Sequence, residues 1–227
     1  MTKPFVVFLE IGKQRTFAGA IDWPGWCRSG RDEATALENL LAYGPRYARA
    51  LRSTDLGFTA PADAAVFRVV ERLPGNATTD FGAPGAPLAD DKNAVDAVEL
   101  RRLEALLKAC WKAFDGAVKA AAGKELRLGP RGGGRDVERM IRHVLESEGA
   151  YLQALGGKAP KETAGDLAVY TKATRQAVLA SLAASVRGEI PPIGPRGGLR
   201  WAPRTFVRRV AWHALDHAWE VEDRILT

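Results

Sequence analysis

Two of the three histidines in this sequence stand four residues apart, in AWHALDHAW at 211–219. Residues at this spacing share one face of an α-helix, so His213 and His217 can direct their imidazoles to one point. Imidazole nitrogens are common ligands of divalent metals, and a buried pair without a metal needs other hydrogen-bond partners. His143 lies among apolar residues of helical spacing and would complete a three-histidine set with an open coordination position. The alternative is a surface or hydrogen-bonded core pair with an unrelated His143.

The motif GPRGG occurs twice, at 129–133 and at 194–198, each time before a segment that carries histidine. Its arginines, Arg131 and Arg196, are candidate substrate-binding residues, because a guanidinium can grip a carboxylate through two parallel hydrogen bonds. The alternative is that the glycines turn the chain and the arginines stay solvated. Neither stretch has the G-x-x-x-x-G-K-[ST] spacing of a phosphate-binding loop.

Acidic residues near the histidines could orient an imidazole or a bound water molecule. Glu146 lies about one turn after His143, and Glu220 lies three residues after His217. We assign no general base, so the catalytic residues stay unknown.

Composition is that of a soluble globular protein, with 46% hydrophobic and 26% charged residues among 227. The N-terminus is a poor secretion signal, which favours a cytoplasmic location. Cys27 and Cys110 are the only cysteines and are far apart in sequence, so we expect no disulfide framework. The net charge of +6 is spread without a long basic tract, which argues against a nucleic-acid partner.

The first part of the chain predicts a small domain over residues 1–75. A helix is expected over 31–51, kinked or split at Pro45. Strand-like composition occurs in PFVVFLEIG (4–12), TFAGAID (16–22) and AAVFRVVERL (64–73). The resulting order is β-β-(β)-α-β, with one helix on a face of a small antiparallel sheet.

The second part of the chain has a different periodicity. Residues 76–91 are rich in Pro, Gly and Ala, which predicts a linker. Residues 92–227 predict a four-helix bundle, with apolar stripes over about 91–125, 137–155, 163–186 and 204–226. The fold class is therefore α+β.

The N-terminal domain resembles HicB-like antitoxin domains over roughly residues 4–73. The likeness rests on Asp22–Trp23–Pro24–Gly25, on Gly30 and on Ala36–Leu37–Glu38–Asn39. Trp26 departs from the family, which usually has a small residue or cysteine there, and no DNA-binding segment follows. We therefore expect an accessory or oligomerisation module rather than an antitoxin.

The helical domain resembles the DinB-like four-helix proteins over roughly residues 92–227. That family carries one ligand histidine in its second helix and an H-x-x-x-H pair in its fourth, which match His143, His213 and His217. The resemblance implies a divalent metal, zinc or nickel, and thiol-dependent transferase or isomerase activity with a low-molecular-weight thiol. It also implies that the helices can have an up-down-down-up order.

Two classes of function stay open on this basis. The first is a metal-dependent enzyme with a small-molecule substrate and a thiol. The second is a non-catalytic regulatory or binding protein, with a structural metal or none. No membrane partner is expected, and an exposed sheet edge could pair across a homodimer.

Overall fold

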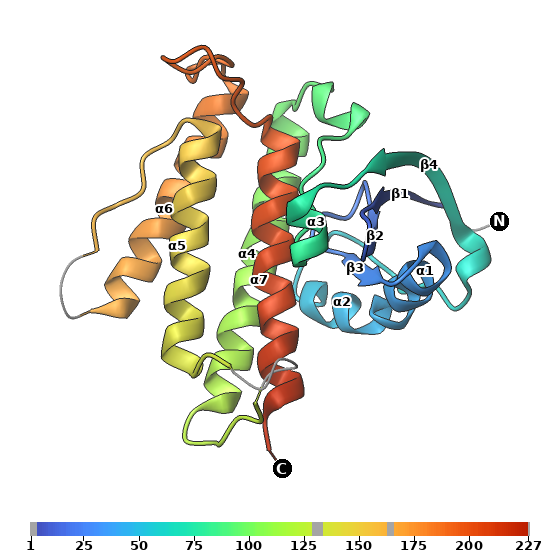
Figure 1. The fold of residues 1–227 in the computed structure, drawn as a ribbon. Helices are drawn as coiled ribbons and strands as arrows, with labels where there is room; N and C mark the ends of the chain where they lie inside the picture. The colour runs from blue at the N-terminus through green and yellow to red at the C-terminus, as the bar shows by residue number, and fades with distance from the viewer. Residues whose placement is uncertain (1–3, 129–133, 163–165, 227) are drawn as a thin grey trace. The chain divides into compact units, whose positions relative to one another are not determined.

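The computed structural model describes residues 4–128, 134–162 and 166–226 (Figure 1). The chain forms two compact units, Met1–Asn93 and Ala94–Thr227. Unit 1 carries a sheet with short helices, and unit 2 carries the four long helices. The fold is mixed α+β, as the sequence predicts.

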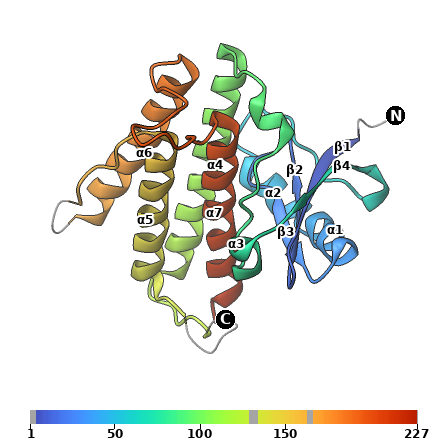
Figure 2. The ribbon, with the colours of Figure 1, turned by 45° about the horizontal axis from the view of Figure 1, so that its top comes forward.

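The sheet of unit 1 has four strands in the order β3-β2-β1-β4 (Figure 2). Their bounds are β1 Phe5–Ile11, β2 Thr16–Ala20, β3 Cys27–Gly30 and β4 Phe67–Pro74. The hairpins β1-β2 and β2-β3 are antiparallel, but β4 runs parallel to β1, with Val7 opposite Val69. The expectation of a wholly antiparallel sheet was therefore wrong. A long helical crossover separates β3 from β4, and such a crossover permits parallel pairing.

Two helices, rather than one, make the crossover. They are α1, Glu33–Ala42, and α2, Gly44–Leu51. The Asp32 side chain caps α1 by accepting a hydrogen bond from the Thr35 backbone N–H. Pro45 lies in the first turn of α2, where its missing N–H costs nothing, and this confirms the predicted break.

The predicted linker is folded in the structure. Residues 76–91 contain helix α3, Ala77–Phe81, and the start of a 3₁₀ turn, Ala89–Lys92. The buried carboxylate of Glu10 in β1 accepts hydrogen bonds from this segment and fastens it to the sheet. The segment belongs to unit 1, and it is folded against the sheet, although its composition suggests a linker.

Unit 2 is built from α4 Ala97–Ala121, α5 Val137–Leu155, α6 Leu167–Val186 and α7 Pro203–Arg224. The side chains of Asp96, Asp136 and Asp166 cap the first three of these helices. Because Asp96 caps α4, this helix begins later than the predicted start near residue 91.

The four helices run in two parallel pairs (Figure 1). Arg204 at the start of α7 pairs with Glu99 at the start of α4 at 3.0 Å, so α4 and α7 run in the same direction. The backbone N–H of Trp201, just before α7, donates to the Ala154 carbonyl near the end of α5, so α5 runs the opposite way. Helix α6 follows the direction of α5, which gives an up-down-down-up order.

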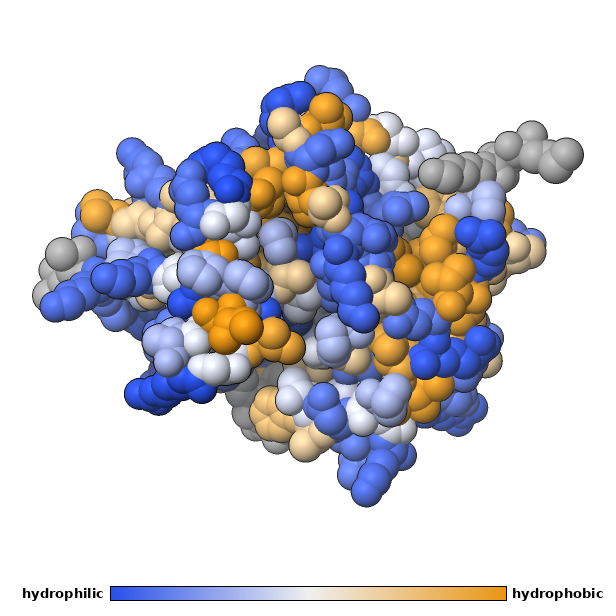
Figure 3. Space-filling model, turned by 90° about the horizontal axis from the view of Figure 1, so that it is seen from above, coloured by the Kyte–Doolittle hydropathy of each residue, from blue (hydrophilic) through white to orange (hydrophobic). Residues whose placement is uncertain are grey.

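Large hydrophobic side chains are mostly buried, and the exposed ones are scattered along the chain. Figure 3 shows several separate hydrophobic groups among hydrophilic ones on one face. In the described part of the chain the most exposed are Phe81, Leu128 and Leu199, which lie far apart in sequence. Among the described helices, none is long and apolar enough to span a membrane.

Candidate metal centre

Helix α7 brings His213 and His217 together as their spacing predicts. Both side chains are buried, with 6% and 8% of their surface exposed. Their rings are perpendicular, with the Nε2 atoms 3.1 Å apart. Phe206, Val210 and Val221 of the same helix are fully buried, so this face of α7 is anchored in the core of the unit.

Helix α5 supplies His143, the third member of the triad. Its ring centroid lies 5.0 Å from that of His213 and 4.9 Å from that of His217. The three residues each offer a ring nitrogen, and these nitrogens lie within 4.8 Å of one another. His143 is only half-buried, so the triad has one solvent-accessible side. The predicted gathering of all three histidines is confirmed.

A partly buried chain of polar side chains orients His217. Its Nδ1 lies 2.8 Å from Oε2 of Glu220, whose Oε1 accepts a hydrogen bond from Nη1 of Arg224. The Arg224 guanidinium also donates to the backbone carbonyls of Arg127 and Arg135. The α4–α5 connection is thereby linked to the triad through two side chains of α7.

This arrangement fixes the tautomer of His217. A carboxylate only accepts hydrogen bonds, so Nδ1 of His217 must carry the proton that Glu220 receives. The Nε2 atom, which faces His213, then carries a lone pair. Carboxylate–histidine pairs of this kind accompany metal-ligating histidines generally.

The surroundings keep the other two imidazoles neutral. Burial, together with the charges of His217 and Arg135, lowers the pKa of His143 to about 4. Burial, followed by the charges of His217 and His143, holds the pKa of His213 well below its ordinary value. Burial acts to raise the pKa of Glu220, but hydrogen bonds from His217 and Arg224 outweigh it and lower that pKa overall. Two neutral rings and a carboxylate at neutral pH suit cation binding.

The donor set fits a divalent metal. Two imidazole nitrogens bound to one tetrahedral zinc ion lie roughly 3.3 Å apart, close to the 3.1 Å between the Nε2 atoms of His213 and His217. Without a cation, Nε2 of His213 must donate to His217, which leaves a bare lone pair on its buried Nδ1. That Nδ1 has no hydrogen-bond partner among the described residues. With a cation, both Nε2 lone pairs have an acceptor, and Nδ1 of His213 carries the proton instead of a lone pair. The fit to a metal therefore depends on the two Nε2 atoms, because Nδ1 lacks a partner among the described residues in either state.

A tyrosine borders the triad on the α5 side. The ring of Tyr151 lies perpendicular to that of His213, 5.8 Å away, and its hydroxyl accepts a hydrogen bond from Nη2 of Arg209. Burial raises the pKa of Tyr151, although the nearby Arg209 charge opposes this, so the hydroxyl keeps its proton at neutral pH. Neither residue was expected at the site from sequence. Arg209 is one turn before His213 on α7, and this spacing was the available signal.

Of the two candidate arginines, the described structure places only Arg196, and it does not join the triad. Arg131 lies outside the described residues. Arg196 is exposed in a turn before α7, whereas His213 lies about 15 Å further along that helix at 1.5 Å per residue. Of the two acids considered, Glu220 contacts His217 and Glu146 is exposed.

Comparison with protein families, with curated proteins and with solved structures finds no match for this chain.

Proposed function

We propose that unit 2 is a metal-dependent enzyme domain, in which His143, His213 and His217 hold one divalent metal, zinc or nickel. The observation that carries the proposal is the opposition of the two Nε2 atoms at 3.1 Å, with the tautomer of His217 fixed by Glu220. In the proposal the reaction is of the thiol-dependent transferase or isomerase type. Its chemistry comes from the resemblance to the DinB-like family.

A metal held by three neutral imidazoles would favour the thiolate form of a bound thiol and polarise an electrophile. The chain's own residues have separate tasks. Glu220 and Arg224 hold the His217 ring in place, and the half-buried His143 leaves one side of the triad open to small molecules. The neutral Tyr151 hydroxyl, held by Arg209, can donate a hydrogen bond to an anionic substrate.

Three described histidines form the cluster, and no described Asp, Glu or Cys joins it as a fourth ligand. Catalytic zinc sites characteristically have three protein ligands and one exchangeable position, whereas structural sites have four. A site with three described protein ligands favours the enzyme over the regulatory protein with a structural metal.

The test is a metal-dependent activity screen. The protein is stripped with a chelator, reloaded with Zn²⁺ or Ni²⁺, and incubated with glutathione or cysteine and either an activated chloroarene or a cis-unsaturated diketone. The proposal expects conjugation or isomerisation that needs the metal, the thiol and His143. A reloaded protein that is inactive toward every pair, and whose metal has no exchangeable water, would support the regulatory alternative.

A further inference from the structure

A groove of about 710 Å³ lies between α4, α5 and α6 of unit 2. This volume is within the range of about 300–1,000 Å³ that small-molecule sites occupy. None of the three histidines is among the described residues that line it, so it is distinct from the metal centre. The groove has no role in the proposed enzyme chemistry.

The groove lining is mostly apolar and also carries cationic side chains. Helix α4 is antiparallel to α5 and α6, so its last turns lie beside their first turns. Val118, Ile141 and Leu167 line the groove there. Further along, the lining includes Trp111, Arg175 and the apolar Leu179.

Charge along the groove favours an anion. Lys108, Lys172 and Arg175 line it, and Asp115 is the single acid among its described lining residues. Arg175 binds Asp115 through two hydrogen bonds of 2.7 Å, which neutralises one cation. Lys108 pairs with Glu104 of α4 at 3.9 Å, so Lys172 is the lining cation without an ion pair among the described residues.

The guanidinium of Arg175 keeps an unused donor. Its Nε is buried and has no hydrogen-bond partner among the described residues. The Arg175 charge lies over the ring of Trp111, 5.5 Å from its centroid, which holds the side chain in the groove wall. A buried donor without an acceptor is costly, and an anionic ligand group would satisfy it.

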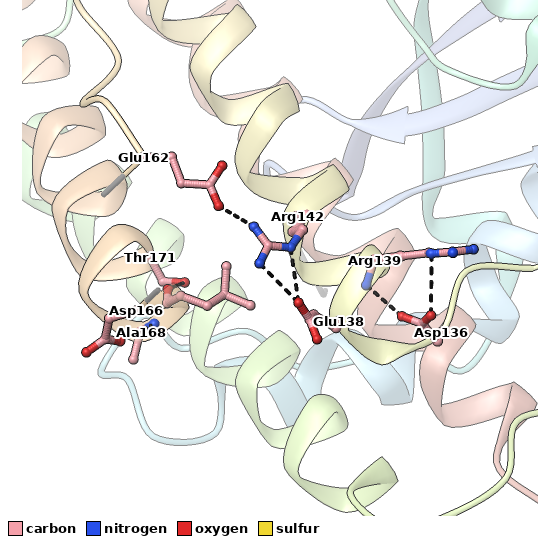
Figure 4. Close-up of polar contacts among 9 residues, drawn as sticks. Asp136, Glu138, Arg139, Arg142, Glu162, Asp166, Ala168 and Thr171 are labelled. Atoms are coloured by element: carbon pink, nitrogen blue, oxygen red, sulfur yellow. Dashed lines mark hydrogen bonds and ion pairs between the residues drawn. The ribbon is translucent and has the colours of Figure 1, made fainter. Parts of the chain in front are cut away.

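The wall that α6 contributes is anchored at its start (Figure 4). The Asp166 side chain accepts hydrogen bonds from the backbone N–H groups of Ala168 and Val169. Nearby, Arg142 of α5 pairs with Glu138 and with Glu162 of the segment that leads into α6. These contacts fix the first turn of α6, which carries Ala168 on the groove.

From these observations we propose that the groove binds one amphiphile with an elongated apolar body and a single anionic head, such as a medium-chain carboxylate. The head lies toward Lys172 and Arg175, which are one turn apart on α6, and the body extends along Val118 and Leu167. The inference is independent of the metal and of the proposed enzyme activity.

Calorimetric titration of the full chain with decanoate, below its micelle concentration, tests the proposal. We expect saturable binding of one decanoate per chain. Octanoate should bind roughly three- to fourfold more weakly per missing methylene, because the groove buries the chain. Decanol, which has the same body without the charge, should bind at least tenfold more weakly. No saturable binding, or equal binding of decanol and decanoate, would overturn the proposal.

Matched variants locate the site. Ala168 lines the groove, whereas its neighbour Val169 is exposed and does not. Ala168→Trp should therefore abolish decanoate binding, and Val169→Trp should leave it unchanged. Circular dichroism of both variants checks that the fold is retained.

A second pair of variants tests the recognition of the head. Lys172→Glu should weaken decanoate binding at least tenfold without changing decanol binding. Lys119→Glu changes the same charge on α4 outside the groove lining and should have no effect. If Ala168→Trp and Lys172→Glu both bind decanoate as the unaltered protein does, the groove is not the site.

Discussion

Nδ1 of His217 lies 2.8 Å from Oε2 of Glu220, one turn further along α7. This contact determines which nitrogen of His217 carries the proton, and therefore which nitrogen is free for a metal. Replacing Glu220 by Gln keeps the shape of the side chain but removes its charge. We expect Glu220→Gln to weaken metal binding about 10- to 100-fold, the usual effect of losing such a partner.

The matched control is Glu146→Gln, because Glu146 is an exposed acid one turn after His143. It should bind metal as the unaltered protein does. Competition with a chromophoric chelator measures both affinities. Equal losses of metal affinity in the two variants would show that the negative charge near the site, rather than the orientation of His217, determines the affinity.

Metal binding should resist acid. Protons compete with the metal for imidazole nitrogens, so affinity falls once the pH drops below the pKa of a ligand histidine. Three histidines at the ordinary pKa of about 6.5 would cost several hundredfold in affinity between pH 7 and pH 5.5. Because the pKa of His143 is lowered to about 4 and that of His213 is also lowered, we expect a loss of no more than about tenfold. A loss of several hundredfold in chelator competition at the two pH values would contradict the geometry described for the site.

Glu148 of α5 should make the protein less stable as the pH rises. Its carboxyl is buried, and one oxygen accepts a 2.7 Å hydrogen bond from Nε1 of Trp111. Burial raises its pKa to about 7, although the nearby Arg175 and the Trp111 hydrogen bond oppose this. Because the folded pKa exceeds the unfolded value of about 4.5, the neutral carboxyl favours folding below about pH 4.5. This contribution is lost as the pH rises through about 7.

Through this shift, Glu148 should lower the free energy of unfolding by about 3 kcal/mol between pH 4.5 and pH 8. Glu148→Gln should remove most of that dependence, because the amide cannot ionise and still accepts from Trp111. Urea unfolding of the metal-free protein at pH 5 and pH 8 measures it. If the two proteins lose stability equally as the pH rises, the assignment to Glu148 is wrong.

Glu10 should be essential to unit 1. Its fully buried carboxylate accepts hydrogen bonds from the Thr79 hydroxyl and from the backbone N–H groups of Gly85 and Ala86. Glu10→Ala leaves these donors unsatisfied, and we expect a loss of about 3 kcal/mol in the free energy of unfolding. Amide hydrogen exchange at Gly85 and Ala86 should accelerate together.

The control for Glu10 is Glu71→Ala. Glu71 also accepts from a backbone N–H, that of Ala89, but at 3.2 Å and in an exposed position. Glu71→Ala should lower the free energy of unfolding by less than about 1 kcal/mol. Unchanged exchange at Gly85 in the Glu10 variant would show that other contacts hold residues 76–91 to the sheet.

Local pattern was enough to predict the helices and the triad. The spacing of His213 and His217 determines their common face, and the apolar stripe around His143 turns that ring inward. The predicted bounds of α5, 137–155, agree with the structure because Asp136 caps its start and Gly156, with a φ of 101°, ends it.

Contacts between residues distant in sequence were not predictable in this way. The parallel pairing of β4 with β1 depends on the path of the crossover, which composition does not specify. Residues 76–91 have the composition of a linker, and only the buried charge of Glu10 reveals why they fold. Arg224 lies one turn beyond Glu220. Its other partners are the backbone carbonyls of Arg127 and Arg135, and such contacts cannot be predicted from a sequence pattern.

The most direct test of the central claim is the metal content of the purified chain and of its histidine variants at limiting metal. The protein, stripped and titrated with Zn²⁺ or Ni²⁺ against a chromophoric chelator, should bind one ion per chain. His143→Ala, His213→Ala and His217→Ala should each weaken that binding by at least 100-fold, and X-ray absorption should show imidazole nitrogens at about 2.0–2.1 Å for zinc. Full occupancy in the His213→Ala and His217→Ala variants at limiting metal would contradict the account.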